Sequence, residues 1–282
     1  MTKIKSIYII VYNRVMNETP NIKIYEPMKI EDEKRKLLNE RIPRPPFRII
    51  LVGQTGSGKS NLIKNFLFTK GFYKDYFDMI YLWCGSLDDC EEYELLMDNT
   101  KYMEWNEKKN EYYKSKKGDL EDKMSISHGV DEDDLEELFH SLETNEDTED
   151  DRILWVFDDM VVSKLLQSKG RMNVLDNAFV RGRHIGAGLS VILSTQKYRA
   201  LNQNMRISNS SHLVLYHGLS KMDMDIIAME ASGILDKEQF LKLFKDNVKK
   251  KYQFLIIQLR ESPEKMFLNS KFEYVDIQLY KN

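Results

Sequence analysis

Residues 53–60 read Gly-Gln-Thr-Gly-Ser-Gly-Lys-Ser and match the pattern G-x-x-x-x-G-K-[ST]. This spacing is typical of a phosphate-binding loop, in which successive backbone N–H groups and a helix N-terminus surround an anion. We expect Lys59 to reach the β- and γ-phosphates of ATP and Ser60 to place its hydroxyl on Mg²⁺. Gly53 and Gly58 should adopt backbone conformations that a Cβ atom would forbid. The residues predicted to bind the nucleotide are Gly53, Gln54, Thr55, Gly56, Ser57, Gly58, Lys59, Ser60 and Asn61.

A pair of carboxylates, Asp158 and Asp159, ends the apolar run Ile153–Phe157, about a hundred residues further along the chain. Mg²⁺ in nucleotide sites keeps several waters and takes one or two carboxylates beside the phosphate oxygens. We therefore predict that Asp158 supports the metal, through water, and that Asp159 positions and polarises the attacking water. A loop or a helix cap is the alternative for an Asp-Asp pair that lacks this context.

A second apolar run, residues 190–196, ends in Thr195 and Gln196. A polar side chain at the tip of a buried strand can lie beside the γ-phosphate, so Gln196 is the predicted sensor of hydrolysis. The alternative is an amide that only satisfies backbone groups at a strand end. Arg206 is the first candidate, and Arg183 the second, for an arginine that a neighbouring subunit inserts to stabilise the transferring phosphoryl group. Each of the two is equally compatible with a surface arginine or a DNA contact.

The elements that must position these residues alternate between strands and helices. Strands are predicted at residues 47–52, 78–83, 152–157, 189–196, 211–217 and 252–259, with residues 267–275 as a hairpin partner of the last. Helices are predicted at residues 61–68, 172–184, 221–231 and 236–244, and Ser220 and Asp236 cap the last two. The pattern indicates an α/β protein of the P-loop NTPase class. Its central sheet should be mostly parallel with helices on both faces, and the nucleotide should bind at the carboxyl ends of the strands.

Composition divides the chain into an N-terminal extension, residues 1–45, and a P-loop ATPase domain, residues 46–282. The extension is expected to contain a charged helix at 30–41 and a stiff proline-rich link at 42–46. A charged insertion is expected at about 101–151, because residues 131–151 hold twelve acidic side chains and no lysine or arginine. Leu135, Leu138 and Leu142 form one helical stripe there. We expect one or two exposed helices and a mobile acidic loop, with solvation as the default role of the charge.

Charge, cysteine spacing and hydropathy argue against a strongly basic protein, a cysteine-ligated metal site and a membrane-spanning protein. The formal net charge of −3 provides no overall positive field for nucleic acid, so DNA binding requires a local patch or an oligomer. Cys84 and Cys90 lack metal-ligand spacing and are expected to be reduced thiols. No apolar run approaches the length of a membrane span.

Over residues 46–260, roughly, the chain resembles the genome-packaging ATPases of large double-stranded DNA viruses, the poxvirus-type branch of the FtsK–HerA superfamily. Similar proteins occur in virophages and in Maverick/Polinton-type elements. The shared features are the loop at 53–60, the strand ending in Asp158-Asp159, and Arg183-His184 ahead of the Thr195-Gln196 strand. The segment 204–215, which leads into a late strand, is shared as well. The Asp-Asp ending, where many ATPases have Glu, is common in this viral branch.

The resemblance implies an additional-strand P-loop fold, with the Gln-bearing strand between the P-loop strand and the Asp-Asp strand. It also implies a homo-oligomeric ring, pentamer or hexamer, that hydrolyses ATP at subunit interfaces and pulls double-stranded DNA into a capsid. Contact with capsid proteins, a location in the host-cell cytoplasm at the viral assembly site and association with the virion follow from the same resemblance. Contacts to phosphates rather than base edges would make DNA binding salt-sensitive and independent of sequence.

Three other functions stay open at this point. A HerA-like cellular translocase or helicase would carry the same motifs and differ in its genomic neighbours. A GTPase switch lacks support, because no Asn-Lys-x-Asp segment is present. A non-catalytic nucleotide-binding scaffold conflicts with the intact Lys59, Ser60, Asp158 and Asp159.

Overall fold

The computed structural model describes residues 41–97, 103–106, 111–114, 123–159 and 173–281, with backbone alone at 103–106 and 111–114. These residues all lie in one compact unit, residues 37–282. The helix expected at 30–41 and the first residues of the chain lie outside the described part, except for Arg41. Ile42 is buried and Tyr73 donates a hydrogen bond to the Pro43 carbonyl, so the proline-rich link packs on the domain.

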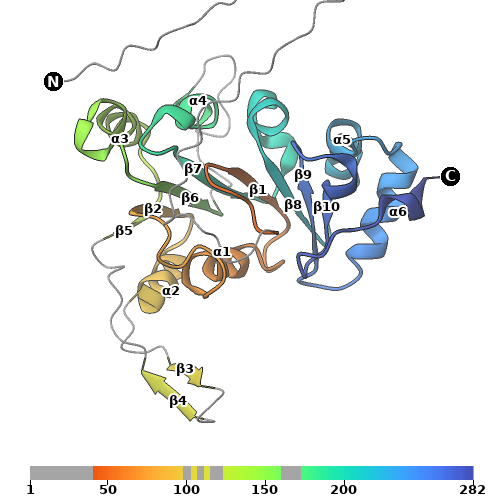
Figure 1. Cartoon of the computed structure of the whole chain (residues 1–282), viewed down its shortest axis with the longest axis horizontal. Helices are drawn as coiled ribbons and strands as arrows, with labels where there is room; N and C mark the ends of the chain where they lie inside the picture. The colour runs from red at the N-terminus through yellow and green to blue at the C-terminus, as the bar shows by residue number, and fades with distance from the viewer. Residues whose placement is uncertain (1–40, 98–102, 107–110, 115–122, 160–172, 282) are drawn as a thin grey trace, which may run out of the picture. The chain divides into compact units, whose positions relative to one another are not determined.

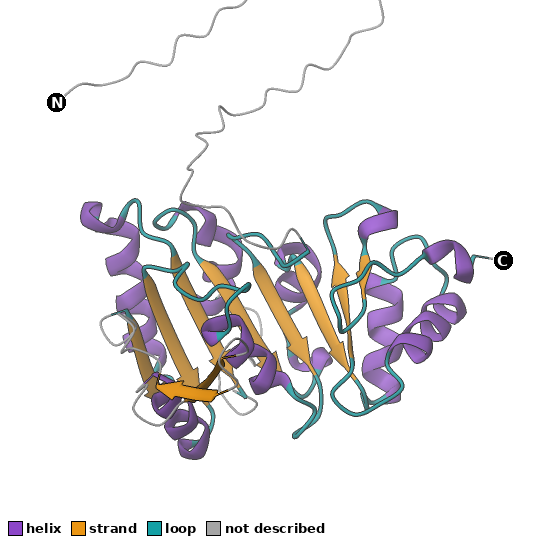
Figure 2. Cartoon of the chain, turned by 60° about the horizontal axis from the view of Figure 1, so that its bottom comes forward, coloured by secondary structure: helices purple, strands orange, loops and turns teal. Residues whose placement is uncertain are grey.

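A mixed sheet of eight strands, in the order β10-β9-β8-β1-β7-β6-β2-β5, forms the centre of the fold (Figures 1 and 2). Its strands are β1 Arg48–Val52, β2 Met79–Cys84, β5 Met124–His128, β6 Ile153–Asp158, β7 Ser190–Thr195, β8 His212–Tyr216, β9 Phe254–Gln258 and β10 Phe267–Leu268. From β8 to β5 all neighbours pair parallel, whereas β9 pairs antiparallel with β8 and β10 antiparallel with β9. Strands β3 Met103–Asn106 and β4 Glu111–Lys114 form a separate antiparallel pair.

The strand order confirms the predicted fold class. Strand β7, which ends at Thr195 just before Gln196, pairs with β1 on one side and with β6 on the other. The polar tip of β7 therefore lies between the P-loop and the Asp-Asp pair. This is the arrangement of an additional-strand P-loop NTPase.

Helices cover both faces of the sheet. They are α1 Lys59–Phe68, α2 Leu87–Met97, α3 Glu132–Thr144, α4 Val174–Arg181, α5 Lys221–Ala231 and α6 Lys237–Asn247. Apolar side chains of α1 and α2 belong to the same core cluster as Ile49 and Leu51 of β1, whereas those of α3 to α6 belong to the cluster that contains Ile50 and Val52. Because side chains alternate across a strand, β1 buries both of its faces, which explains its continuous apolar sequence.

The structure differs from the expected charged insertion at 101–151 in one respect. Strand β5 extends the main sheet beside β2, from Ile80 opposite Met124 to Cys84 opposite His128. Helix α3 packs its buried Leu135 and other apolar residues, Phe139 and Leu142, into the core. The polar sequence of β5 concealed it, because an edge strand needs few apolar side chains. The predicted helical leucine stripe is present, with Leu138 partly buried at its margin.

Candidate functional site

The P-loop connects β1 to α1 at the carboxyl end of the sheet. The Gly53 N–H donates to the Thr195 carbonyl at 3.1 Å and the Ser57 N–H to the Gln54 carbonyl at 3.1 Å, which ties the loop to β7 and closes its turn. Gly58 has φ 104° and precedes the first residue of α1. This left-handed conformation needs glycine, as predicted.

Gly53 is required for a different reason from the one expected. Its φ is not positive, and a Cβ atom there would lie 2.5 Å from Ser57 Oγ and 2.7 Å from Tyr216 Cβ. Glycine at this position therefore provides space for the close approach of β8 and the loop, rather than an unusual backbone conformation.

Lys59 is buried and its ammonium group points back into the loop. Nζ lies 2.9 Å from the Gly53 carbonyl and 3.2 Å from the Gln54 carbonyl. Burial lowers the pKa of Lys59, while the nearby Asp159 and Asp158 carboxylates oppose that shift. The loop carbonyls and the two carboxylates thus keep the Lys59 ammonium group at the position where the sequence predicts the β- and γ-phosphates of ATP.

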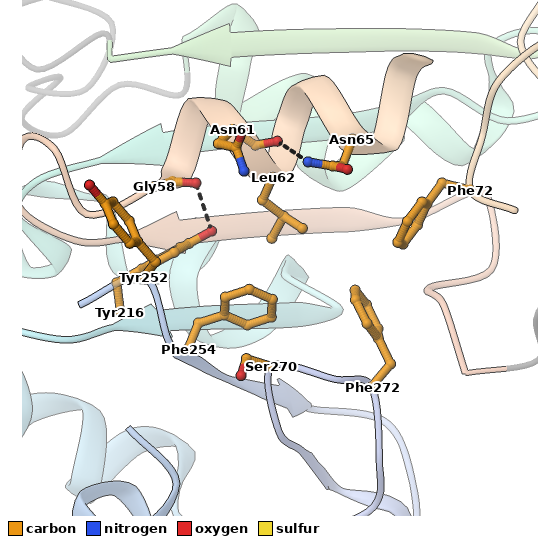
Figure 3. A pocket seen from close by; sticks show the side chains of 10 residues that line it. All are labelled: Gly58, Asn61, Leu62, Asn65, Phe72, Tyr216, Tyr252, Phe254, Ser270 and Phe272. Carbon is orange, nitrogen blue, oxygen red and sulfur yellow. Dashed lines mark hydrogen bonds between the residues drawn. The ribbon is translucent and has the colours of Figure 1, made fainter. Parts of the chain in front are cut away.

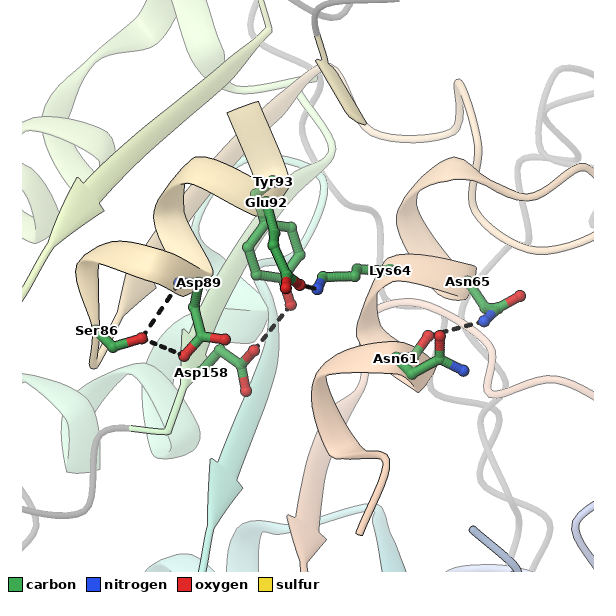
Figure 4. Close-up of polar contacts among 8 residues, drawn as sticks. All are labelled: Asn61, Lys64, Asn65, Ser86, Asp89, Glu92, Tyr93 and Asp158. Carbon is green, nitrogen blue, oxygen red and sulfur yellow. Dashed lines mark hydrogen bonds and ion pairs between the residues drawn. The ribbon is translucent and has the colours of Figure 1, made fainter. Parts of the chain in front are cut away.

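Asp158 ends β6 and is fully buried. Its Oδ2 accepts a hydrogen bond from Tyr93 Oη at 2.9 Å and its Oδ1 from Ser194 Oγ at 2.7 Å (Figure 4 shows the Tyr93 contact). Burial raises the pKa of Asp158, and hydrogen bonds from the side chains of Ser194, Ser60 and Tyr93 counteract that rise. The structure thus places Ser60 close to Asp158, as expected for the two predicted metal residues.

Asp159 adopts an unusual backbone conformation, with φ 53°. Non-glycine residues seldom enter this region, and aspartate is among those that tolerate it. Its N–H donates to Ser194 Oγ at 2.9 Å, and its Oδ1 accepts from Gln196 Nε2 at 3.0 Å. The predicted water-positioning residue and the predicted sensor therefore form one hydrogen-bonded pair.

Gly85, just beyond β2, allows the turn at Asp159. Its N–H donates to the Asp158 carbonyl at 2.8 Å, and a Cβ atom on Gly85 would lie 2.2 Å from the Asp159 carbonyl oxygen. A side chain at this position would displace the backbone that carries both carboxylates.

The two candidate arginines do not join this cluster within their own chain. Arg206 lies in the π-helical turn Asn204–Asn209, with Nη2 2.8 Å from Glu230 Oε1, and both side chains are only 14% exposed. Its guanidinium also lies over the Tyr198 ring, 5.4 Å from the centroid. Arg183 is exposed, at the amino-terminal edge of the sheet, where its Nε donates to His184 Nε2 at 2.9 Å.

Sequence reasoning missed three residues of this site: Tyr93, Ser194 and Gly85. Ser194 carried a usable signal, because a hydroxyl inside an otherwise apolar strand needs a buried partner. Tyr93 carried none, since helix α2 was not predicted and its contact with Asp158 joins residues 65 positions apart.

The residues present fit a single hard cation held jointly with phosphate, and not a protein-only metal centre. Within the described residues no group of three or more His, Cys, Asp or Glu side chains could hold a metal ion. Cys84 and Cys90 are free, buried thiols. None of the helices in the described part of the chain is long and apolar enough to cross a membrane.

Known structures share this fold. The DNA-packaging ATPase B204 of Sulfolobus turreted icosahedral virus is 18% identical, with a TM-score of 0.52 over 80% of this chain and 97% of that one. The genome-packaging NTPase B204 of Sulfolobus turreted icosahedral virus 2, in complex with ATP-γ-S, is 19% identical, with a TM-score of 0.54 and the same coverage. At these identities the likeness establishes the fold.

The comparison with curated protein sequences found no match. A family model, in contrast, establishes the relationship of this chain to known proteins. The family model of the poxvirus A32 protein matches residues 33–265, which contain the P-loop, the Asp-Asp pair and Gln196. This confirms the viral family that the motifs indicated, and the chain belongs to the poxvirus A32 protein family.

Proposed function

We propose that this chain is an ATPase that uses the energy of ATP hydrolysis to move double-stranded DNA into a viral capsid. The observation that supports it best is the cluster at the carboxyl ends of β1, β7 and β6. There Lys59, Ser60 and Asp158 stand together, beside the hydrogen-bonded Asp159 and Gln196. The related B204 proteins are described as genome-packaging enzymes, one of them with an ATP analogue.

ATP binds with its phosphates on the N–H groups of residues 53–60. Lys59 then exchanges the Gly53 and Gln54 carbonyls for β- and γ-phosphate oxygens, so its charge is already in place before the substrate arrives. Ser60, by its hydroxyl, and Asp158 are the residues that would hold Mg²⁺. When bound, this ion neutralises charge on the phosphates.

Asp159 orients the attacking water and accepts its proton. An aspartate side chain is about 1.5 Å shorter than a glutamate side chain. The left-handed backbone conformation of Asp159 changes the direction in which its side chain leaves the end of β6. Gln196 is a positioning residue for this carboxylate, because its amide donates to Oδ1. When the γ-phosphate leaves, the same amide loses or changes this contact, and β7 carries the change to the P-loop through the Thr195 carbonyl.

An arginine from a neighbouring subunit completes the site in a ring of five or six copies. Exposure favours Arg183 over Arg206, because Arg206 would first have to leave Glu230. The ring contacts DNA phosphates irrespective of sequence, docks on capsid proteins and works in the host cytoplasm.

The experiment measures ATP turnover with and without duplex DNA for the wild type and Lys59→Ala, and particle size in ATP. We expect DNA-stimulated turnover, assembly in ATP, and a loss of about a hundredfold or more in Lys59→Ala, since the lost cation acts on the transition state. Lys70→Ala is the matched control, because this exposed lysine lies just beyond α1. Equal, slow turnover in the wild type and Lys59→Ala would replace the proposal with a nucleotide-binding scaffold, and a DNA-insensitive monomer would exclude a motor.

A further inference from the structure

The two ends of the parallel strands carry different groups. At the carboxyl ends lies the P-loop, and a cavity lined by residues that include Gly58 and Tyr216 adjoins the loop there (Figure 3). The opposite, amino-terminal edge of the sheet carries a cluster of three arginines, Arg48, Arg183 and Arg260. Strand β1, which rises about 3.3 Å per residue, separates this cluster from the loop. The nucleotide site of the same chain therefore does not account for the arginine cluster.

Arg48, the first residue of β1, is only 4% exposed. It alternates with Ile49 and so shares a face of the strand with Ile50. A Cβ atom on Gly182 would lie 3.5 Å from Arg48 Nη2, which places the guanidinium against the turn that follows α4. The Nε and Nη2 atoms of Arg48 are buried and have no hydrogen-bond partner among the described residues. A buried guanidinium without an acceptor is unfavourable, so this position favours the binding of an anion.

Backbone hydrogen bonds bring Arg260 to the same place. The Ser211 N–H donates to the Arg48 carbonyl at 2.9 Å, and the Leu259 N–H donates to the Ser211 carbonyl at 2.9 Å. Arg260 follows Leu259 directly and is exposed, with Nη2 3.5 Å from the Asn209 carbonyl oxygen. The cluster therefore has a buried arginine and an exposed one side by side.

Arg183 is the third cation of the cluster. It is exposed and follows Gly182, which lies against the Arg48 guanidinium. Within the described part of the chain none of the three arginines forms an ion pair with a carboxylate. Burial, and then the charges of Arg260 and Arg183, lower the pKa of Arg48 to about 10, so Arg48 is still a cation at neutral pH. The cluster is thus a local positive patch on a chain whose net charge is −3.

A phosphate group suits this cluster better than a carboxylate. Guanidinium groups donate paired hydrogen bonds to phosphate oxygens, and a tetrahedral phosphate offers acceptors to several of them at once. We propose that Arg48 and Arg260, with Arg183 at the rim, bind a phosphate group of the backbone of duplex DNA. This phosphate supplies the acceptor that the buried Arg48 guanidinium lacks. The DNA source rests on the proposed function, whereas free inorganic phosphate has the same chemistry and is distinguished by experiment.

The first experiment measures the affinity for duplex DNA at several NaCl concentrations. Mg²⁺ and a non-hydrolysable ATP analogue are present throughout, so that the P-loop is filled. The slope of log affinity against log salt becomes shallower by about 0.9 for each phosphate contact that is lost. We expect this change in Arg260→Gln, equally for two duplexes of unrelated sequence, with unaltered ATP turnover in the absence of DNA. Lys271→Gln, which removes an exposed charge elsewhere, is the control and should keep the wild-type slope.

The second experiment compares melting temperatures in inorganic phosphate and in NaCl of equal ionic strength, with the same analogue present. Phosphate should raise the melting temperature of the wild type, because it binds only the folded chain. Arg48→Met should not respond, since methionine occupies the buried space without the charge. Arg260→Gln should respond less than the wild type, and this exposed position keeps the test decisive if Arg48→Met does not fold.

The outcomes separate the two phosphate sources, and this inference from the proposed function. A response to inorganic phosphate with an unchanged DNA slope in Arg260→Gln would overturn the role in DNA binding and assign the site to free phosphate. No response in either experiment would overturn the site. Arg260→Gln that fails to assemble in ATP, with slope and phosphate response unchanged, would also overturn it, because a carboxylate of a neighbouring copy then occupies the cluster. A wild type that binds the analogue but not DNA would overturn the proposed motor, while its response to phosphate still decides the site.

Discussion

Removal of the Tyr93 hydroxyl tests how the buried Asp158 carboxylate is held. Tyr93 is completely buried, and its Oη donates at 2.9 Å to Asp158 Oδ2. Phenylalanine keeps the ring and its packing against α1, where Lys64 Nζ lies 5.1 Å from the Tyr93 ring centroid. Tyr93→Phe therefore deletes one of the two hydroxyl hydrogen bonds to Asp158, and Ser194 donates the other.

The magnitude follows from the charge and burial of the acceptor. A hydrogen bond to a charged group contributes about 1.5–3 kcal/mol, and the remaining donor, Ser194, reduces the loss. We expect Tyr93→Phe to lower the free energy of unfolding by about 1.5 kcal/mol. ATP turnover should fall about tenfold, as for other groups that orient a metal-binding carboxylate, and the Mg²⁺ concentration for half-maximal turnover should rise.

The assays are urea unfolding and steady-state ATP turnover as Mg²⁺ is varied. Tyr81→Phe is the control, because this half-buried tyrosine on β2 has no hydrogen bond to Asp158. In an Asp158→Asn background the Tyr93→Phe substitution should have a smaller effect on turnover, since the two side chains act together. Unchanged stability, turnover and Mg²⁺ dependence in Tyr93→Phe would refute the reasoning.

Three further predictions concern other parts of the fold. Gly53→Ala places a Cβ atom 2.7 Å from Tyr216 Cβ, so it should lower the unfolding free energy by about 1–3 kcal/mol in urea titrations and weaken nucleotide binding. Arg206→Met leaves the 14%-exposed Glu230 carboxylate without its cation, and should lower the free energy of unfolding, measured by thermal melting, by about 2 kcal/mol. Normal stability with lost ATP turnover would instead identify Arg206 as the arginine that acts on a neighbouring subunit. Burial lowers the pKa of His212 to about 4. As pH falls from about 6.5 to about 4, His212 is protonated in the unfolded chain before it is protonated in the folded chain, so the free energy of unfolding decreases. Urea unfolding at pH 7 and pH 4.5 should show a loss of up to about 3 kcal/mol from this group that His212→Gln removes.

The sequence predicted the parts of this protein that depend on local pattern. The P-loop and the Asp-Asp strand follow from short motifs on apolar strands, whereas the position of β7 between β1 and β6 was implied by the family resemblance. The capped starts of α5 and α6 at Ser220 and Asp236 were likewise predictable, because an N-cap is a local hydrogen bond.

Contacts between distant segments were not predictable from the same patterns. The position of Tyr93 beside Asp158, and the close approach of Gly85 to Asp159, depend on how β2 and α2 pack on β6. Strand β5 was missed because its five residues, Met-Ser-Ile-Ser-His, include only two apolar side chains, too few for a clear strand pattern. Arg206 resembled a free arginine, since nothing near it in the sequence announced Glu230, 24 residues away.

A crystal structure of the chain with Mg²⁺ and a slowly hydrolysed ATP analogue tests the central claim most directly. We expect the phosphates on the N–H groups of residues 53–60, Lys59 Nζ moved from the Gly53 carbonyl to the phosphates, and the ion beside Ser60 and Asp158. A triphosphate bound elsewhere, or Asp158 and Asp159 directed away from it, would contradict the account.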